Sequence, residues 1–148
     1  MNKRKNIITV AIDSPAAAGA GTQAKFIAKE YNLLYLDTGK IYRLIGKIKL
    51  TAGKKFNYSF IKKKISNIKI NQLNNAKLIS DDIAKCASIV AKDNNIRKLV
   101  KKFQLNCAYN PPKKYSGSVL DGRDITSVIM KDAMFKFYIT ANLNIRAK

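Results

Sequence analysis

Histidine and tryptophan are absent from this 148-residue sequence, and cysteine occurs only at Cys86 and Cys107. The absence of histidine removes the side chain that enzymes use most often as a general base at neutral pH. Two cysteines without any histidine also offer neither a zinc site nor a disulfide framework. We therefore expect two buried thiols in a reducing compartment, and a chemistry that does not depend on a histidine base.

Long apolar runs are also missing, since no stretch approaches the roughly 20 residues that a membrane-spanning helix needs. The basic N-terminus, residues 1–6, leads into a short β-branched run and not into the apolar core of a signal peptide. A hydrophobic content of 47% is enough for a chain of this length to bury a core. These features predict a single domain over residues 1–148, in the cytoplasm and without a membrane partner.

Acidic residues are few, with 9 against 29 lysines and arginines, so the formal net charge is +20. Such a charge attracts polyanions and raises the hypothesis of a nucleic-acid-binding protein. The lysines are spread along the chain, however, and no zinc-finger spacing or aromatic RNA-binding motif accompanies them, so no specific nucleic acid partner is expected. Arginine, which binds phosphate in a bidentate manner, is scarce and occurs at Arg4, Arg43, Arg97, Arg123 and Arg146.

A run of small residues, Ala16 to Gly21, lies between the apolar stretch Ile7–Ile12 and a helical pattern. Strand, small-residue loop and helix form the arrangement in which backbone N–H groups converge on one phosphate. In the P-loop pattern G-x-x-x-x-G-K-[ST], the first glycine would be Ser14, the second Gly19 and the lysine Ala20. The stretch is therefore either a phosphate cradle without its usual cation or an ordinary strand-to-helix turn.

Hydrophobic spacing predicts strands and helices in alternation, which indicates a parallel sheet with ligands outside the carboxyl ends of its strands. Further strands are expected over 33–36, 119–120 and 135–139, and helices over 22–31, 38–50, 60–65, 81–90, 95–103 and from 142 to 148. Residues 68–79 suggest a small β-ribbon or an irregular insert. In the first helix Phe26, Ile27 and Ala24 are expected to face inward, and Asn95 is expected to cap the fifth.

Three segments of the chain resemble the bacterial cytidylate kinases, which are P-loop nucleoside monophosphate kinases. They read LDTGKIYR at 36–43, CASIVAKDNNIR at 86–97 and LDGRDITSVI at 120–129. The stretch IDSPAAAGAGT is similar to the family's phosphate loop, which normally reads IDGPxxxGKGT, and the order and spacing match over nearly the whole chain. The resemblance implies an α/β fold of the P-loop nucleoside triphosphate hydrolase type, with three layers, a parallel central sheet, a mobile lid and a small monophosphate-binding insert that includes residues 54–80.

The resemblance also implies transfer of the terminal phosphoryl group of ATP to CMP or dCMP, with Mg²⁺ accompanying ATP. The residues at the family's ATP phosphate-binding positions are Ser14, Ala17, Gly19, Ala20, Gly21 and Thr22. Those at its CMP-binding positions are Thr38, Tyr42, Arg43, Ser88, Arg97, Arg123 and Asp124. Arg123 and Asp124 are also the catalytic candidates, and Asp121 is a candidate for an indirect role near the metal. Because three scarce arginines fall on anion-binding positions, this interpretation is favoured over a mere tight turn at 121–124.

Two departures from the family pattern bear on activity. Ala20 replaces the P-loop lysine, and losing one charge-assisted hydrogen bond of about 1.5–3 kcal/mol would slow phosphoryl transfer roughly ten- to a hundredfold. Lys25 and Lys40 are candidates to replace that lysine. The chain also stops at Lys148, so we expect a truncated cytidylate kinase without its lid, monomeric and weakly active or inactive. The alternative is a non-catalytic nucleotide-binding protein, and a charge-driven nucleic-acid binder is the least favoured hypothesis.

Overall fold

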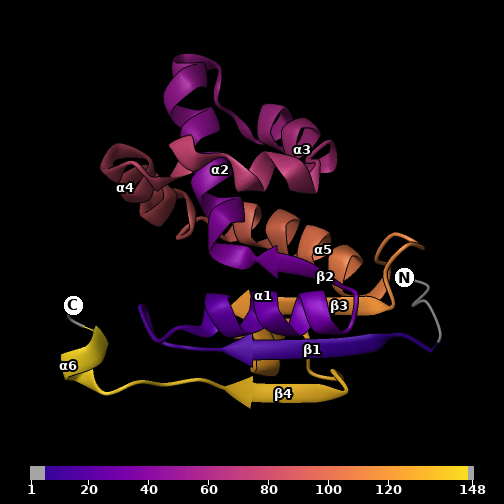
Figure 1. Ribbon diagram of the computed structural model, residues 1–148. Coiled ribbons are helices and arrows are strands. Elements are labelled where there is room, and N and C mark those ends of the chain that lie inside the picture. The colour runs from indigo at the N-terminus through magenta and orange to yellow at the C-terminus, as the bar shows by residue number, and fades with distance from the viewer. Residues whose placement is uncertain (1–5, 147–148) are drawn as a thin grey trace. The chain divides into compact units, whose positions relative to one another are not determined.

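The computed structural model describes residues 6–146, which form two compact units. The first, which we call the sheet unit, comprises residues 6–37 and 104–146. The second, the helical unit, comprises residues 38–103. Figure 1 labels the elements of both. Residues 54–80, which the sequence assigns to a monophosphate-binding insert, lie within the helical unit.

A four-stranded parallel sheet forms the centre of the sheet unit, in the order β2-β3-β1-β4. Its strands are β1 (Ile8–Asp13), β2 (Leu33–Asp37), β3 (Gly117–Gly122) and β4 (Phe135–Tyr138). The two inner strands are apolar and almost entirely buried, as parallel strands covered on both faces must be. The predicted parallel α/β fold of the P-loop nucleoside triphosphate hydrolase type is thereby confirmed.

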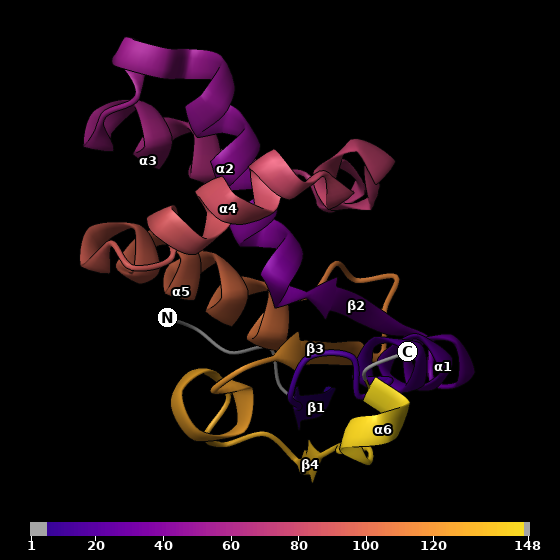
Figure 2. The same ribbon diagram turned by 90° about the vertical axis from the view of Figure 1, so that its left-hand side faces the viewer.

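The helix α1 (Ala20–Glu30) covers one face of this sheet (Figure 2). Ala20, Ala24 and Ala28 recur at helical spacing and pack against apolar residues of β1, β2 and β3. Ile27 is partly buried there, as expected, but Phe26 is 65% exposed and its prediction was wrong. The reason is geometric, because Phe26 lies about 200° around the helix from Ala24.

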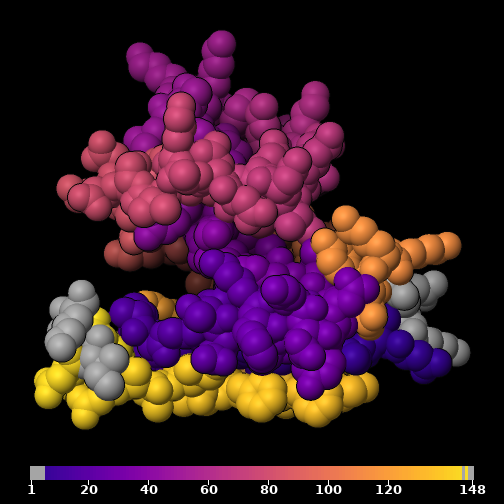
Figure 3. Space-filling model, in the orientation of Figure 1, coloured from indigo at the N-terminus to yellow at the C-terminus, as the bar shows by residue number. Residues whose placement is uncertain are grey.

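The last turn of the helix α5 (Asn94–Tyr109) packs on the opposite face of the sheet, which makes the sheet unit three-layered. There the buried hydroxyl of Ser118 in β3 donates a 2.7 Å hydrogen bond to the carbonyl of Ala108. Strand β4 lies at the sheet edge, and its side chains are exposed on the outer surface (Figure 3). The short helix α6 (Leu143–Arg146) follows β4, while residues 147 and 148 of the predicted helix lie outside the described residues.

The helical unit contains α2 (Thr38–Ala52), α3 (Tyr58–Ser66), α4 (Asp81–Val90) and most of α5. Residues 68–79 form 3₁₀ turns, Ile70–Asn74 and Ala76–Ile79, so the β-ribbon alternative was wrong. Side-chain oxygens of Gln72 and Asn75 accept hydrogen bonds from nearby backbone N–H groups and hold these turns. The cap of α5 is Asp93 and not Asn95, because its Oδ1 accepts from the N–H groups of Asn95 and Ile96.

Within residues 6–146, no helix combines the length and the apolar character that crossing a membrane would require. Both cysteines carry free thiols and are buried, as predicted. Burial raises the pKa of the Cys107 thiol to about 12.

We expect Gly46→Ala to lower the melting temperature by about 3–10 °C. A Cβ at position 46 would lie 2.8 Å from the backbone nitrogen of Ala87 and 3.0 Å from the carbonyl oxygen of Ile83, where α2 packs on α4. Backbone atoms cannot rotate away as a side-chain tip can. Thermal unfolding followed by circular dichroism measures the shift. Lys85→Ala on the exposed face of α4 is the control, and an equal melting temperature for Gly46→Ala would contradict the close packing.

We expect the stability of the protein to fall between pH 8 and 10 by about 1–2 kcal/mol more than that of Cys107→Ala. The thiol pKa is raised to about 12 in the folded state, so above about pH 9 only the unfolded state releases the proton. The stabilisation present below the unfolded pKa is therefore lost as the pH rises. Urea unfolding at both pH values measures it, and identical pH profiles for the two proteins would refute it.

Candidate functional site

Two loops meet at the carboxyl ends of β1 and β3, where the sequence predicts ligand binding. The strands pair in register up to Asp13 opposite Gly122, so the loop after β1 and the loop after β3 begin side by side. The N–H of Ser14 donates to the carbonyl of Gly122 at 3.2 Å. The predicted phosphate-loop residues 14–22 and the candidates Arg123 and Asp124 are thus brought together in the sheet unit.

The loop from Ser14 to Gly19 leads directly into α1, which begins at Ala20. Gly19 adopts φ 81°, and the first N–H groups bonded within α1 are those of Thr22 and Gln23, which reach the Gly19 carbonyl. The N–H groups of Ala20 and Gly21 precede them and have no acceptor inside the helix. A helix start of this kind favours an anion.

Left-handed backbone in this loop falls on Ala17 and Gly19, not on Ser14. Ala17 has φ 59°, a conformation that costs a non-glycine residue about 1–2 kcal/mol. Ser14, where the family pattern has glycine, needs no positive φ, so that substitution is mild. The left-handed turn thus falls on an alanine, and backbone strain of this kind gathers at functional loops.

A carboxylate that the sequence did not single out joins the two loops. Asp13, the last residue of β1, accepts hydrogen bonds from the N–H of Ile125 at 2.6 Å and the N–H of Thr126 at 3.1 Å. Its Oδ2 also accepts from the Thr126 hydroxyl. These bonds fix the segment after Asp124, which itself adopts φ 59° and accepts at its carbonyl from two following N–H groups. The side chains of Arg123 and Asp124 are therefore exposed, while hydrogen bonds fix the backbone that follows them.

Asp121, the candidate for an indirect role near a metal, is 8% exposed at the end of β3. The Tyr35 hydroxyl donates a hydrogen bond to its carboxylate. Burial raises the pKa of Tyr35 well above its ordinary value, and the negative charges of Asp121 and Asp37 raise it further, so the hydroxyl stays protonated. A Cβ at Gly21 would lie 3.4 Å from both the Asp121 Oδ2 and the Tyr35 oxygen, which places this pair beside the start of α1.

The helical unit carries the other predicted CMP-binding residues. Thr38 is buried at the start of α2, and Tyr42 follows one turn later. Burial raises the pKa of Tyr42 above its ordinary value, and the positive charge of Arg97 opposes this rise in part. Arg43 is half-buried and donates through Nη1 to the carbonyl of Leu78 at 3.0 Å.

Ser88 and Arg97 lie on exposed surfaces of α4 and α5. The Ser88 hydroxyl donates to the carbonyl of Ala84, one turn earlier in its own helix, at 3.1 Å. Arg97 donates through Nη1 to the carbonyl of Ala91 at 3.4 Å, which directs its guanidinium toward the end of α4. The bond of Arg97 uses one of the five N–H donors of its guanidinium. The bond of Ser88 uses the single donor of its hydroxyl, whose oxygen can still accept hydrogen bonds.

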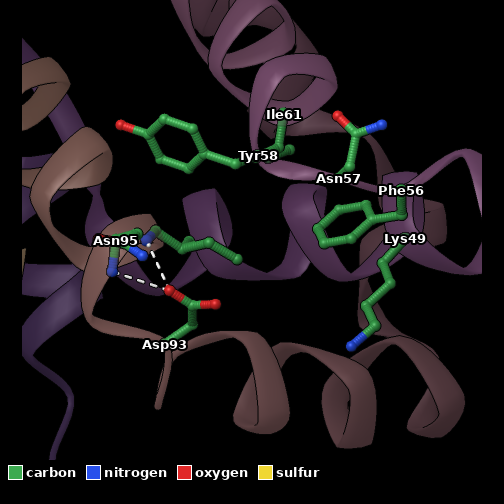
Figure 4. A pocket seen from close by; sticks show the side chains of 8 residues that line it. Lys49, Phe56, Asn57, Tyr58, Ile61, Asp93 and Asn95 are labelled. Carbon is green, nitrogen blue, oxygen red and sulfur yellow. Dashed lines mark hydrogen bonds between the residues drawn. The ribbon is translucent and has the colours of Figure 1, made fainter.

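A cavity of about 280 Å³ in the helical unit contains none of the predicted nucleotide-binding residues (Figure 4). Asp93 and Asn57 line it, but both cap helices, since Asp93 holds α5 and Asn57 accepts from the N–H of Phe60 in α3. These two side chains thus already hold helices of the unit. The lining residues are Lys49, Phe56, Asn57, Tyr58, Ile61, Asp93, Asn95 and Ile96.

Comparison of the sequence with known proteins shows the family of the chain. The cytidylate kinase family model matches residues 10–148. The chain belongs to the cytidylate kinase family. It is 41% identical to the cytidylate kinase of Bartonella tribocorum over 94% of this chain, and 39% identical to that of a Bradyrhizobium species over 93%. The cytidylate kinase of Agrobacterium fabrum is 38% identical over 95% of this chain.

The chain spans 63% to 65% of the length of these relatives. The assignment of the loop from Ser14 to Thr22 as the phosphate loop, with Ala20 at the lysine position, stays a prediction from the sequence. Sequence reasoning missed Asp13, Thr126 and Tyr35. A carboxylate at the end of β1, directly before the loop, was the available signal for Asp13.

We expect Asp13→Asn to lower the free energy of unfolding by about 1–3 kcal/mol, because an amide offers one neutral acceptor where the carboxylate accepts three hydrogen bonds. Urea denaturation measures the change. Thr126→Ser keeps the hydroxyl and should stay within about 1 kcal/mol of the original protein. Equal losses in the two variants would contradict a central role of the carboxylate.

Proposed function

We propose that this chain binds ATP and CMP or dCMP and transfers the terminal phosphoryl group, giving CDP or dCDP. The observation that carries the proposal is the loop of small residues after β1, which leads from a buried strand directly into the N-terminus of α1. Family membership and the 63% to 65% coverage of named cytidylate kinases support the same activity. The acceptor in this reaction is a phosphate that is already anionic, so the lack of histidine is no obstacle.

Charge on the transferred group is the main problem that such an enzyme solves. The loop offers the N–H groups of Ala20 and Gly21, and Arg123 adds a guanidinium on the neighbouring loop. Mg²⁺ would neutralise charge on the nucleotide phosphates when bound. The residues fit it, because the Thr22 hydroxyl suits a direct ligand, the Asp121 carboxylate suits an indirect one, and Mg²⁺ readily keeps its own waters.

For the acceptor nucleotide, we assign Arg43 and Arg97 to the phosphate of CMP, with Thr38, Tyr42 and Ser88 around the nucleotide. Asp124 is assigned to its sugar or base. Both arginines are held by backbone carbonyls, which reduces the entropy lost when they bind an anion.

A second candidate function is nucleotide binding without catalysis. Ala20 favours it, since the acceptor residues are all present while the donor loop has lost its cation. The two hypotheses make the same prediction for CMP affinity and differ in CDP formation.

We expect Arg97→Ala to weaken CMP binding about ten- to a hundredfold, which corresponds to one lost charge-assisted hydrogen bond of about 1.5–3 kcal/mol. Isothermal titration calorimetry of the full chain with CMP measures it. Lys101→Ala is the matched control, because it removes the same charge from an exposed position one turn further along α5. Equal effects in the two variants would indicate general electrostatic attraction and not a site.

Chromatographic detection of CDP from CMP and Mg-ATP then separates the two functions. CDP formed by the original protein and reduced in Arg123→Ala supports the kinase. CMP binding without CDP supports the non-catalytic alternative, and the absence of CMP binding rejects both.

A further inference from the structure

The short helix α6 at the end of the described chain returns to the phosphate loop. Both ribbon views place it close to the start of α1, and Arg146 donates through Nε to the carbonyl of Ala16 at 3.0 Å (Figures 1 and 2). Ala16 lies within the loop from Ser14 to Gly19. One guanidinium is therefore attached to the backbone of a loop whose own lysine is missing.

Lysine at position 20 would normally reach the terminal phosphates of the nucleotide. Here that position carries a methyl group, buried to 4% exposure against the sheet. Lys25, one of the candidates to replace it, is exposed on α1. It lies about 140° around the helix from Ala20 and about 7.5 Å further along its axis, so it points away from the loop.

We propose that Arg146 supplies the positive charge that the phosphate loop lacks at Ala20, by binding the β- or γ-phosphate of the donor nucleotide. This inference rests on the proposed function of the same loop. A guanidinium carries five N–H donors in a planar fork, and the bond to Ala16 uses one of them. Its two terminal amino groups match the oxygens of a phosphate.

The hydrogen bond from Arg146 to the Ala16 carbonyl also explains how a residue of α6 can act at a fixed position beside the loop. The sequence separation between Arg146 and Ala16 is 130 residues, and the carbonyl bond holds the guanidinium at the loop before any ligand arrives. The acceptor carbonyl belongs to the peptide that precedes Ala17, so the strained φ of 59° lies next to the group that orients Arg146. A donor held in advance costs less entropy on binding than a free lysine.

The test compares the affinities of the full chain for Mg-ATP, for inorganic tripolyphosphate with Mg²⁺ and for CMP, all by calorimetry. Arg146→Gln should weaken ATP and tripolyphosphate binding about tenfold or more and change CMP binding less than about twofold. Arg146→Lys should retain part of the affinity, because the charge remains. Lys25→Gln, which removes an exposed charge from α1, should change it less than about twofold.

The double variant Arg146→Gln with Ala20→Lys should recover affinity for both phosphate ligands. A role of Arg146 in merely docking α6 would not be rescued in this way, and the melting temperature of each variant identifies any that fails to fold. Unchanged polyphosphate binding in Arg146→Gln, a larger loss in Lys25→Gln, or no polyphosphate binding by the original protein would each overturn the proposal.

CDP formation and ATP binding together distinguish failure of the proposed kinase function from failure of this inference. If no CDP forms while Arg146→Gln weakens ATP binding as expected, the inference stands and catalysis is rejected. If CDP forms at equal rates with and without Arg146, catalysis stands and the inference is rejected.

Discussion

The parallel pairing of β1 with β3 is the constraint on which the candidate donor site depends. The two strands end opposite each other, at Asp13 and Gly122, and this common end places the phosphate loop beside Arg123 and Asp124. Gly117 fixes the register at the other end, because a Cβ there would lie only 1.8 Å from the Ile8 carbonyl oxygen. A two-residue slip would preserve the apolar pattern but would carry Asp13 away from the N–H groups of Ile125 and Thr126.

Local patterns predicted the elements that local forces determine. The strands and the starts of α2 and α4 follow from apolar runs and turn residues that lie next to each other in the sequence. The predictions that were wrong concern which of several nearby residues, or which of two local structures, is used. Asp93 takes the cap of α5 from Asn95 because it lies two and three positions before the N–H groups that need an acceptor. In residues 68–79, where the sequence had suggested a β-ribbon or an irregular insert, hydrogen bonds from backbone N–H groups to nearby side chains stabilise turns.

In the candidate site, too, short sequence motifs indicate some residues, whereas others have their partners far away in the sequence. Motifs at 14–22, 36–43 and 120–129 pointed to candidate residues because the chemistry of each is contained in a few consecutive positions. Asp13 and Arg146 have their partners 112 and 130 residues away, so the sequence around them does not show what they bind, although the place of Asp13 directly before the loop was a signal in its favour. Only the sheet, which brings distant loops to one edge, reveals that these two residues serve the loop that precedes α1.

The net charge of +20 does not remove the need for such a fixed donor. Exposed lysines raise the local concentration of any nucleotide, but in physiological salt their field is screened within about 8 Å, and flexible ammonium groups fix no geometry. Phosphoryl transfer depends on donors that are already in place where negative charge develops. A chain rich in lysine can therefore lack the one cation that matters, and a single guanidinium held by a backbone carbonyl is chemically a better substitute than many mobile lysines.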